Sequence, residues 1–119
     1  MACPKRIAFR ACLLAIFAAL AGCSHFGAER KAQEVASGQR LFQMHCGGCH
    51  NGKEVMVGKQ PPALNGIFQR PTLPSGAPAS DAQVRSTIMQ GRSGIMPPFG
   101  NVLSSEDIRD IIEYLHTLN

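Results

Sequence analysis

The sequence has few large apolar side chains with which to build a core. Tryptophan is absent, and aromatic residues make up only 6% of the 119 residues. A chain of this length forms one domain at most, and a core made of protein alone would be thin. Small domains of this kind often need an additional staple, and a large apolar group bound inside the fold would provide one.

The sequence also lacks the features that a thioredoxin-like site and a zinc site usually require. No stretch alternates apolar and polar residues as a half-buried strand does, so a cysteine pair here lacks the βαβ setting of a thioredoxin-like site. There is also no second Cys/His cluster of the kind that usually completes a zinc site. Against this background one motif is prominent, because residues 46–50 read Cys-Gly-Gly-Cys-His.

The Cys-x-x-Cys-His pattern is typical of covalent attachment of a c-type haem. Cys46 and Cys49 can each form a thioether with one haem vinyl group, and His50 can then bind the iron. The glycines between the cysteines allow the backbone to run close to the porphyrin edge. Two alternatives stay open, namely a redox dithiol and a zinc site that takes His45 as its fourth ligand.

The N-terminus is typical of a targeting segment. Lys5, Arg6 and Arg10 form a positive region, and the apolar run over residues 11–21 is too short to span a bilayer comfortably. Only three of the twelve Lys and Arg residues lie in this segment, with none of the eight Asp and Glu residues. Its removal leaves a net charge of about +1, which predicts no nucleic-acid partner.

Residues 20–23 read Leu-Ala-Gly-Cys and resemble the lipobox of a bacterial lipoprotein. The resemblance implies that residues 1–22 are a signal peptide that is removed, that Cys23 carries lipid, and that residues 23–33 form a membrane tether. Ser24 stands where lipoproteins retained in the inner membrane have aspartate, which favours the outer membrane on the periplasmic side of the cell envelope. The alternative is an ordinary signal peptide cleaved near the same place.

Three amphipathic helices are predicted. The first covers residues 33–45, and its interior Gly38, which costs about 1 kcal/mol relative to alanine, predicts close approach of another helix. The second runs over residues 81–90 and the third begins after Ser104. Each of the last two starts with a Ser-x-x-Gln or Ser-x-x-Asp sequence typical of a capping box. The apolar stripe of the third helix contains Ile108, Ile111, Ile112, Leu115 and Leu118.

Gly38, Phe42 and the motif at 46–50 are spaced as in class I monohaem c-type cytochromes, and the resemblance covers nearly all of residues 34–119. It implies an all-α small cytochrome c fold, with three main helices packed around one covalently attached haem. It also implies that Gly38 and Phe42 pack across the last helix near Tyr114. In bacteria such haem is attached outside the cytoplasm, in agreement with the targeting segment.

Residues 61–68 resemble the proline segment of the same family. An iron-bound histidine usually donates its second ring N–H to a fixed acceptor, and the resemblance implies the Pro62 carbonyl for His50, with Pro61 as second choice. Arg70 matches a family arginine that contacts a haem propionate. The alternative for Arg70 is a solvated surface charge.

The Gly- and Pro-rich segment 91–100 places Met96 in a stiff loop. The family takes its sixth iron ligand from such a loop, and a Met opposite a His raises the haem potential. Alternatively, Met96 fills core space. The rival ligands are Met44, Met56, Met89 and His116.

These features predict an electron carrier and not an enzyme: a lipid-anchored monohaem cytochrome that passes single electrons between a donor and an acceptor redox protein. The same chemistry would serve a cytochrome subunit fixed in a dehydrogenase or oxidase. If Met96 is not bound to iron, a haem peroxidase or gas sensor becomes the alternative, although no distal general base is evident.

Overall fold

A computed structural model of the chain describes residues 26–51 and 61–119. The chain divides into two compact units, Met1–Gln33 and Glu34–Asn119. The predicted lipobox with Cys23 lies outside the described residues, as does Met56. In the described part of the chain, no helix is both long and apolar enough to cross a membrane.

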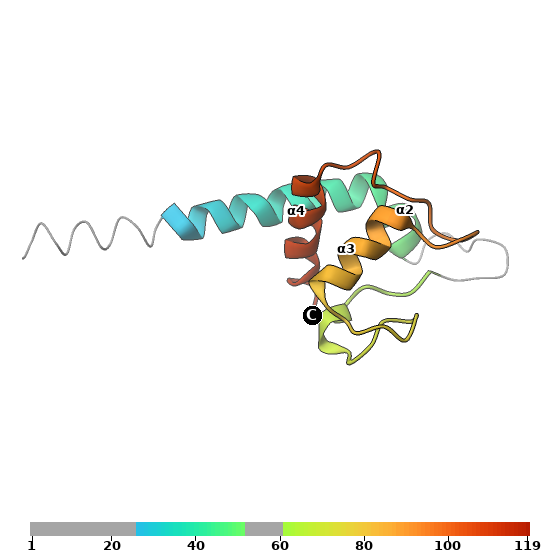
Figure 1. Cartoon of the computed structure of the whole chain (residues 1–119). Coiled ribbons are helices and arrows are strands. Elements are labelled where there is room, and N and C mark those ends of the chain that lie inside the picture. The colour runs from blue at the N-terminus through green and yellow to red at the C-terminus, as the bar shows by residue number, and fades with distance from the viewer. Residues whose placement is uncertain (1–25, 52–60) are drawn as a thin grey trace, which may run out of the picture. The chain divides into compact units, whose positions relative to one another are not determined.

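The second unit is helical (Figure 1). Residues 34–45 form its first helix, and the short α2 (Gly47–His50) follows directly. After the 3-10 turn η1 (Ile67–Gln69) come α3 (Asp81–Gln90) and α4 (Ser105–Leu115). Residues 61–119 add two isolated bridges, Thr72 with Pro78 and Arg92 with Met96, but no strand. The predicted all-α fold with three main helices is therefore confirmed.

The helix that was predicted to start at Gln33 starts earlier. Residues 26–33, in the first unit, are helical as well and all of them are exposed. The segment 28–33 reads Ala-Glu-Arg-Lys-Ala-Gln, and every one of these residues is a strong helix former. The predicted boundary was the first residue of the apolar pattern, but residues before it also have high helix propensity and are helical.

Gly38 marks a close crossing of the first helix with α4. A Cβ atom at Gly38 would collide with the Asp110 carbonyl oxygen and lie 3.0 Å from the Ile111 nitrogen. One turn further on, the rings of Phe42 and Tyr114 pack with centroids 5.4 Å apart. The close helix approach predicted from Gly38 is confirmed, and α4 runs across the first helix in Figure 1.

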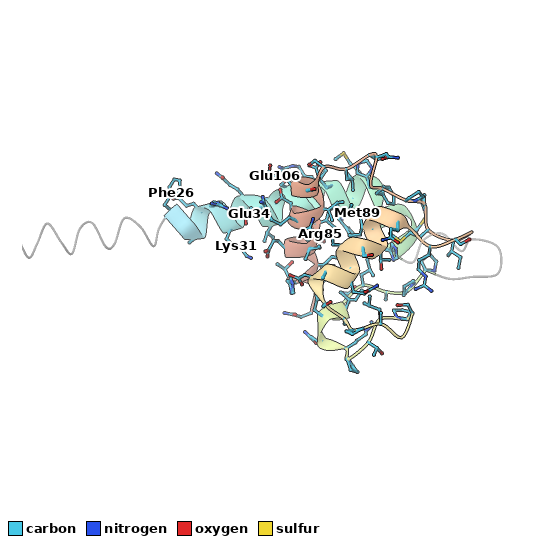
Figure 2. The ribbon with its side chains drawn as sticks, in the orientation of Figure 1. Phe26, Lys31, Glu34, Arg85, Met89 and Glu106 are labelled. Atoms are coloured by element: carbon cyan, nitrogen blue, oxygen red, sulfur yellow. The ribbon has the colours of Figure 1, made fainter. Side chains whose placement is uncertain are left out.

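Arg109 adds charged contacts around the same crossing. Its Nη2 lies 3.0 Å from Glu106, 3.3 Å from Asp110 and 3.8 Å from Glu34 of the first helix. Figure 2 shows Glu34 near α4, the helix to which Glu106 belongs. Because Arg109 is 40% exposed, each pair adds little to stability by itself. Arg109 thus connects Glu34 of the first helix with two carboxylates of α4.

Serine caps start both later helices, but in different ways. Ser104 and Asp107 form a complete capping box at α4, in which the Ser104 N–H donates to Asp107 Oδ2 at 2.8 Å. At α3 the Ser80 Oγ accepts from the Gln83 N–H, 3.4 Å away. The Ser80 N–H instead donates to the Pro78 carbonyl. The Gln83 side chain therefore does not accept a hydrogen bond from the Ser80 N–H, and only half of the predicted capping box forms.

The core of this unit consists of inward apolar side chains from all three long helices. Ile108 and Ile111 of α4 are each 1% exposed, while Val84 and Ile88 of α3 are 5% exposed. Arg85 joins α3 to α4 by donating from Nη1 to the Ser105 carbonyl at 3.2 Å (Figure 2). These elements surround one large cavity, described next.

Candidate cofactor site

The inner faces of the helices and loops enclose a cavity of about 480 Å³. Its wall is mostly apolar, which suits a large apolar ligand. The polar and sulfur-bearing side chains on the wall come from the last residue of the first helix, from the motif, from α3 and from the loop after it. These are His45, Cys46, Cys49, His50, Thr87, Arg92 and Met96.

The single turn of α2 presents the motif to the cavity. The amides of Cys49 and His50 both donate to the Cys46 carbonyl, at 3.1 and 2.9 Å. The Cys46 amide in turn continues the preceding helix by donating to the Phe42 carbonyl at 2.8 Å. This tight turn brings two thiols and one imidazole to the same wall.

The two thiols differ in their surroundings. Cys46 is buried, whereas Cys49 is partly exposed, and neither forms a disulfide. Burial and, to a smaller extent, the neighbouring Cys49 raise the pKa of the Cys46 thiol to about 11. Cys46 is therefore neutral at physiological pH in the folded chain, which makes it a poor member of a reactive dithiol.

His50 is held by the proline segment. Its Nδ1 lies 2.9 Å from the Pro62 carbonyl oxygen. Because a carbonyl only accepts hydrogen bonds, Nδ1 must carry the proton, which leaves the Nε2 lone pair of the neutral ring free. Pro62 is the acceptor that the sequence resemblance favoured over Pro61. The role of this bond in orienting an iron ligand stays a prediction.

Arg70 contacts the backbone of the same segment. Its Nη2 donates to the carbonyls of Ala63 at 3.3 Å and Asn65 at 3.1 Å. In the described part of the chain, Arg70 is not on the cavity wall. These bonds brace the turn that follows Pro62. The contact between Arg70 and a haem propionate remains untested.

Met96 is the one methionine on the wall among the described residues. Met44 and Met89 are 68% and 43% exposed and lie outside the wall. The Met96 loop is fastened to the end of α3, since Phe99 and Gly100 donate to the carbonyls of Ile88 and Met89. Of the rival ligands that the structure describes, none reaches the cavity.

Two histidines have surroundings that the sequence did not indicate. His45 was expected at the surface, yet it lines the cavity and packs edge-on against Phe99, with ring centroids 6.0 Å apart. His116 stacks on Phe68 at 3.9 Å and pairs through Nε2 with Asp81 at 2.8 Å. Helical periodicity indicates on which face of its own helix each side chain lies, but not which residues it contacts. Their partners come from loops and helices far along the chain.

The zinc alternative finds no support in the described residues. Among residues 26–51 and 61–119, no three His, Cys, Asp or Glu side chains are grouped so that they could hold a metal ion. His45 therefore does not complete a four-ligand set with the motif. The wall offers one thioether and one oriented imidazole, which is the donor set of a haem iron.

A family model described as cytochrome c oxidase, cbb3-type, subunit III matches residues 33–115. The chain belongs to this family of cytochrome c domains. A covalently bound haem c and single-electron transfer follow from that membership, and the predicted electron carrier is confirmed. The matched segment begins one residue before the second structural unit.

Among solved structures, cytochrome c6C from Synechococcus sp. PCC 7002 is similar to this chain. The two are 26% identical, with a TM-score of 0.47, and the match covers 66% of this chain and 89% of the cyanobacterial one. No curated protein matches the chain at a significant level.

The cavity wall of this cytochrome fits a haem c on several counts. The lining is mostly apolar, as a large apolar macrocycle requires, and two thiols stand at the wall within one helical turn. An imidazole with its Nδ1 already engaged leaves one nitrogen available for iron. A small domain with few aromatic residues would gain most of its core from such a group.

Proposed function

We propose that this protein is a single-electron carrier in which Cys46 and Cys49 hold the haem by thioethers while His50 and Met96 bind its iron. One observation carries the proposal: two thiols, an oriented imidazole and a single thioether line the same apolar cavity. The bound haem supplies reversible one-electron chemistry between Fe(III) and Fe(II). The residues of the chain hold the haem, supply and orient the ligands of its iron, and exclude water.

In this proposal, His50 is kept in one orientation by the Pro62 carbonyl, which also makes Nε2 a stronger donor to iron. Met96 contributes a soft, uncharged ligand that favours the reduced state. Apolar side chains such as Ile111 and Leu115 exclude water from the cavity. With His50 and Met96 both bound to it, the iron would offer no open position to a peroxide or a gas, and oxidation and reduction would require little rearrangement of the chain, which suits electron transfer.

The ligand assignment is tested by absorption spectroscopy of the haem-loaded protein. Met96→Ala should abolish the sulfur-to-iron charge-transfer band of the oxidised form and admit cyanide rapidly. Met89→Ala and Met44→Ala are matched controls, because both side chains are exposed and lie off the cavity wall. If the Met96→Ala protein keeps the band, or a control variant loses it, another sulfur binds the iron and the ligand assignment is wrong. A wild-type protein without the band and with rapid cyanide uptake would instead favour the peroxidase or sensor alternative.

Lipid anchoring through Cys23 forms a second part of the proposal. The Leu-Ala-Gly-Cys sequence at 20–23 supports it, together with the requirement that c-type haem be attached outside the cytoplasm. A tether of this kind would raise the local concentration of redox partners in the same membrane. Mass spectrometry of the protein purified from membranes should detect a diacylglycerol-modified N-terminus. An unmodified N-terminus would instead indicate an ordinary signal peptide, and fractionation would distinguish inner from outer membrane.

A fixed place in an oxidase is the second candidate, and the description of the matching family favours it. In that arrangement the axial ligands and the electron transfer stay the same, and only the partner changes. Extraction in mild detergent followed by affinity purification separates the two candidates. A stoichiometric complex that survives purification favours the fixed subunit, whereas isolation of the cytochrome alone favours a mobile carrier.

A further inference from the structure

The Met96 loop depends on a contact that only glycine permits. Gly91 follows the last residue of α3 and has φ +66°, and its N–H donates to the Thr87 carbonyl at 2.8 Å. A Cβ at this position would meet the Met96 carbonyl oxygen and would lie 2.7 Å from both Pro97 C and Pro98 N. The backbone that carries the sulfur therefore passes directly over Gly91.

Other bonds hold this backbone in place on both sides of the contact. Arg92 and Met96 exchange two backbone hydrogen bonds, with N···O distances of 2.8 and 3.0 Å. Further along, the Phe99 amide donates to the Ile88 carbonyl at 3.0 Å. Two prolines between these fixed points restrict φ. The segment has little freedom to move away from a new atom at position 91 without also moving Met96.

We propose that Gly91 is a positioning residue for the Met96 thioether. Its missing side chain lets residues 96–98 lie against the end of α3, so that the sulfur faces the cavity before the iron bond forms. The inference rests on the proposed ligation by Met96 and adds to it the element that sets where the ligand stands. Loops held in this way lose less conformational entropy when they bind.

Gly94 provides a matched control in the same loop. Its φ is +71°, nearly that of Gly91, yet a Cβ there would meet no atom within 4 Å. Gly94→Ala therefore introduces the backbone strain of a left-handed alanine without the collision. Gly91→Asn offers a complementary comparison, because asparagine tolerates positive φ better than alanine but carries the same Cβ.

The experiment compares haem-loaded wild-type, Gly91→Ala, Gly91→Asn and Gly94→Ala proteins. The readouts are the intensity of the sulfur-to-iron band, the rate of cyanide uptake and the far-ultraviolet circular dichroism. Both Gly91 variants should lose most of the band and take up cyanide about tenfold faster or more, with their helix content unchanged. Gly94→Ala should match the wild type in band and rate.

Three results would overturn the positioning role. If Gly91→Ala and Gly94→Ala change the band equally, or if Gly91→Asn restores it, strain at positive φ is the cause. If the Gly91 variants fail to fold while Gly94→Ala folds, Gly91 serves the fold as a whole. A wild-type protein without the sulfur band would refute Met96 ligation itself, an outcome that stays distinct because it needs no variant.

Discussion

The first helix of the domain lies so close to the backbone of α4 at Gly38 that no side chain would fit between them. An added methyl group would collide with the Asp110 carbonyl, and neither helix backbone yields easily because Phe42 and Tyr114 pack beside the crossing. We expect Gly38→Ala to lower the free energy of unfolding by about 2 kcal/mol or more, since overpacking outweighs the gain of about 1 kcal/mol in helix propensity. Guanidinium chloride unfolding of the haem-loaded protein measures this.

Gln39→Ala serves as the control for that experiment, because residue 39 is the exposed neighbour on the same helix. Its effect should stay within about 0.5 kcal/mol. A Gly38→Ala protein as stable as the Gln39→Ala protein would show that the two helices can separate at no cost.

At the residue scale, the sequence predicted those roles that depend on chemical type within a short motif. Gly38 was recognised because glycine inside a helix is costly, and the Pro62 carbonyl was chosen because residues 61–68 resemble the proline segment of a known family. The wall position of His45 and the contact over Gly91 were not predicted. His45 meets Phe99, which follows 54 residues later, and Gly91 meets residues 96–98, where the loop folds back onto the end of α3. Neither contact follows from helical periodicity or from a capping pattern.

At the scale of elements, α4 begins with a capping box whose strength depends on pH. Hydrogen bonds from the Ser104 hydroxyl and N–H lower the pKa of the Asp107 carboxyl below its usual value. A carboxylate with a lowered pKa stabilises the fold above its unfolded pKa, and this contribution is lost as the pH falls through the folded pKa. The stabilisation is therefore complete at neutral pH and begins to decrease once the pH falls below about 4, the unfolded pKa of a carboxyl group.

We expect Ser104→Ala to cost about 1 kcal/mol at neutral pH, and the difference from wild type should shrink in acid. Ser80→Ala is the matched control, because the cap of α3 contains no carboxylate that accepts from the serine. Its cost should stay the same between pH 7 and pH 3. Thermal unfolding of both variants across this range provides the measurement. Parallel pH profiles for the two variants would contradict the role of Asp107.

The elements themselves were largely predictable. The range 81–90 predicted for the second helix matches α3, and the predicted serine caps stand at the starts of α3 and α4. The predicted start of the first helix was wrong because its first residues are exposed and have high helix propensity, but show no periodic pattern of apolar residues. The half-formed box at Ser80 was missed because Pro78, two residues upstream, takes the serine N–H first.

For the whole molecule, the cavity determines stability. A volume of about 480 Å³ at the centre of so small a domain removes packing partners from all three long helices, and cavities of much smaller size already cost several kcal/mol. We expect the double variant Cys46→Ala, Cys49→Ala, which lacks covalent haem, to lose cooperative unfolding and much of its helical circular dichroism. Equal unfolding midpoints for the variant and the haem-loaded wild type would show that the protein core alone suffices.

The cavity wall is completed by α4, through Ile111 and Leu115, which lie about 60 residues after the motif. In the folded domain Cys46 is buried behind this wall. Its thiol is accessible to haem only while α4 has not yet packed against the rest of the domain. We therefore expect covalent attachment to precede the final packing of α4, so that the haem is enclosed by the chain and not inserted into a finished fold.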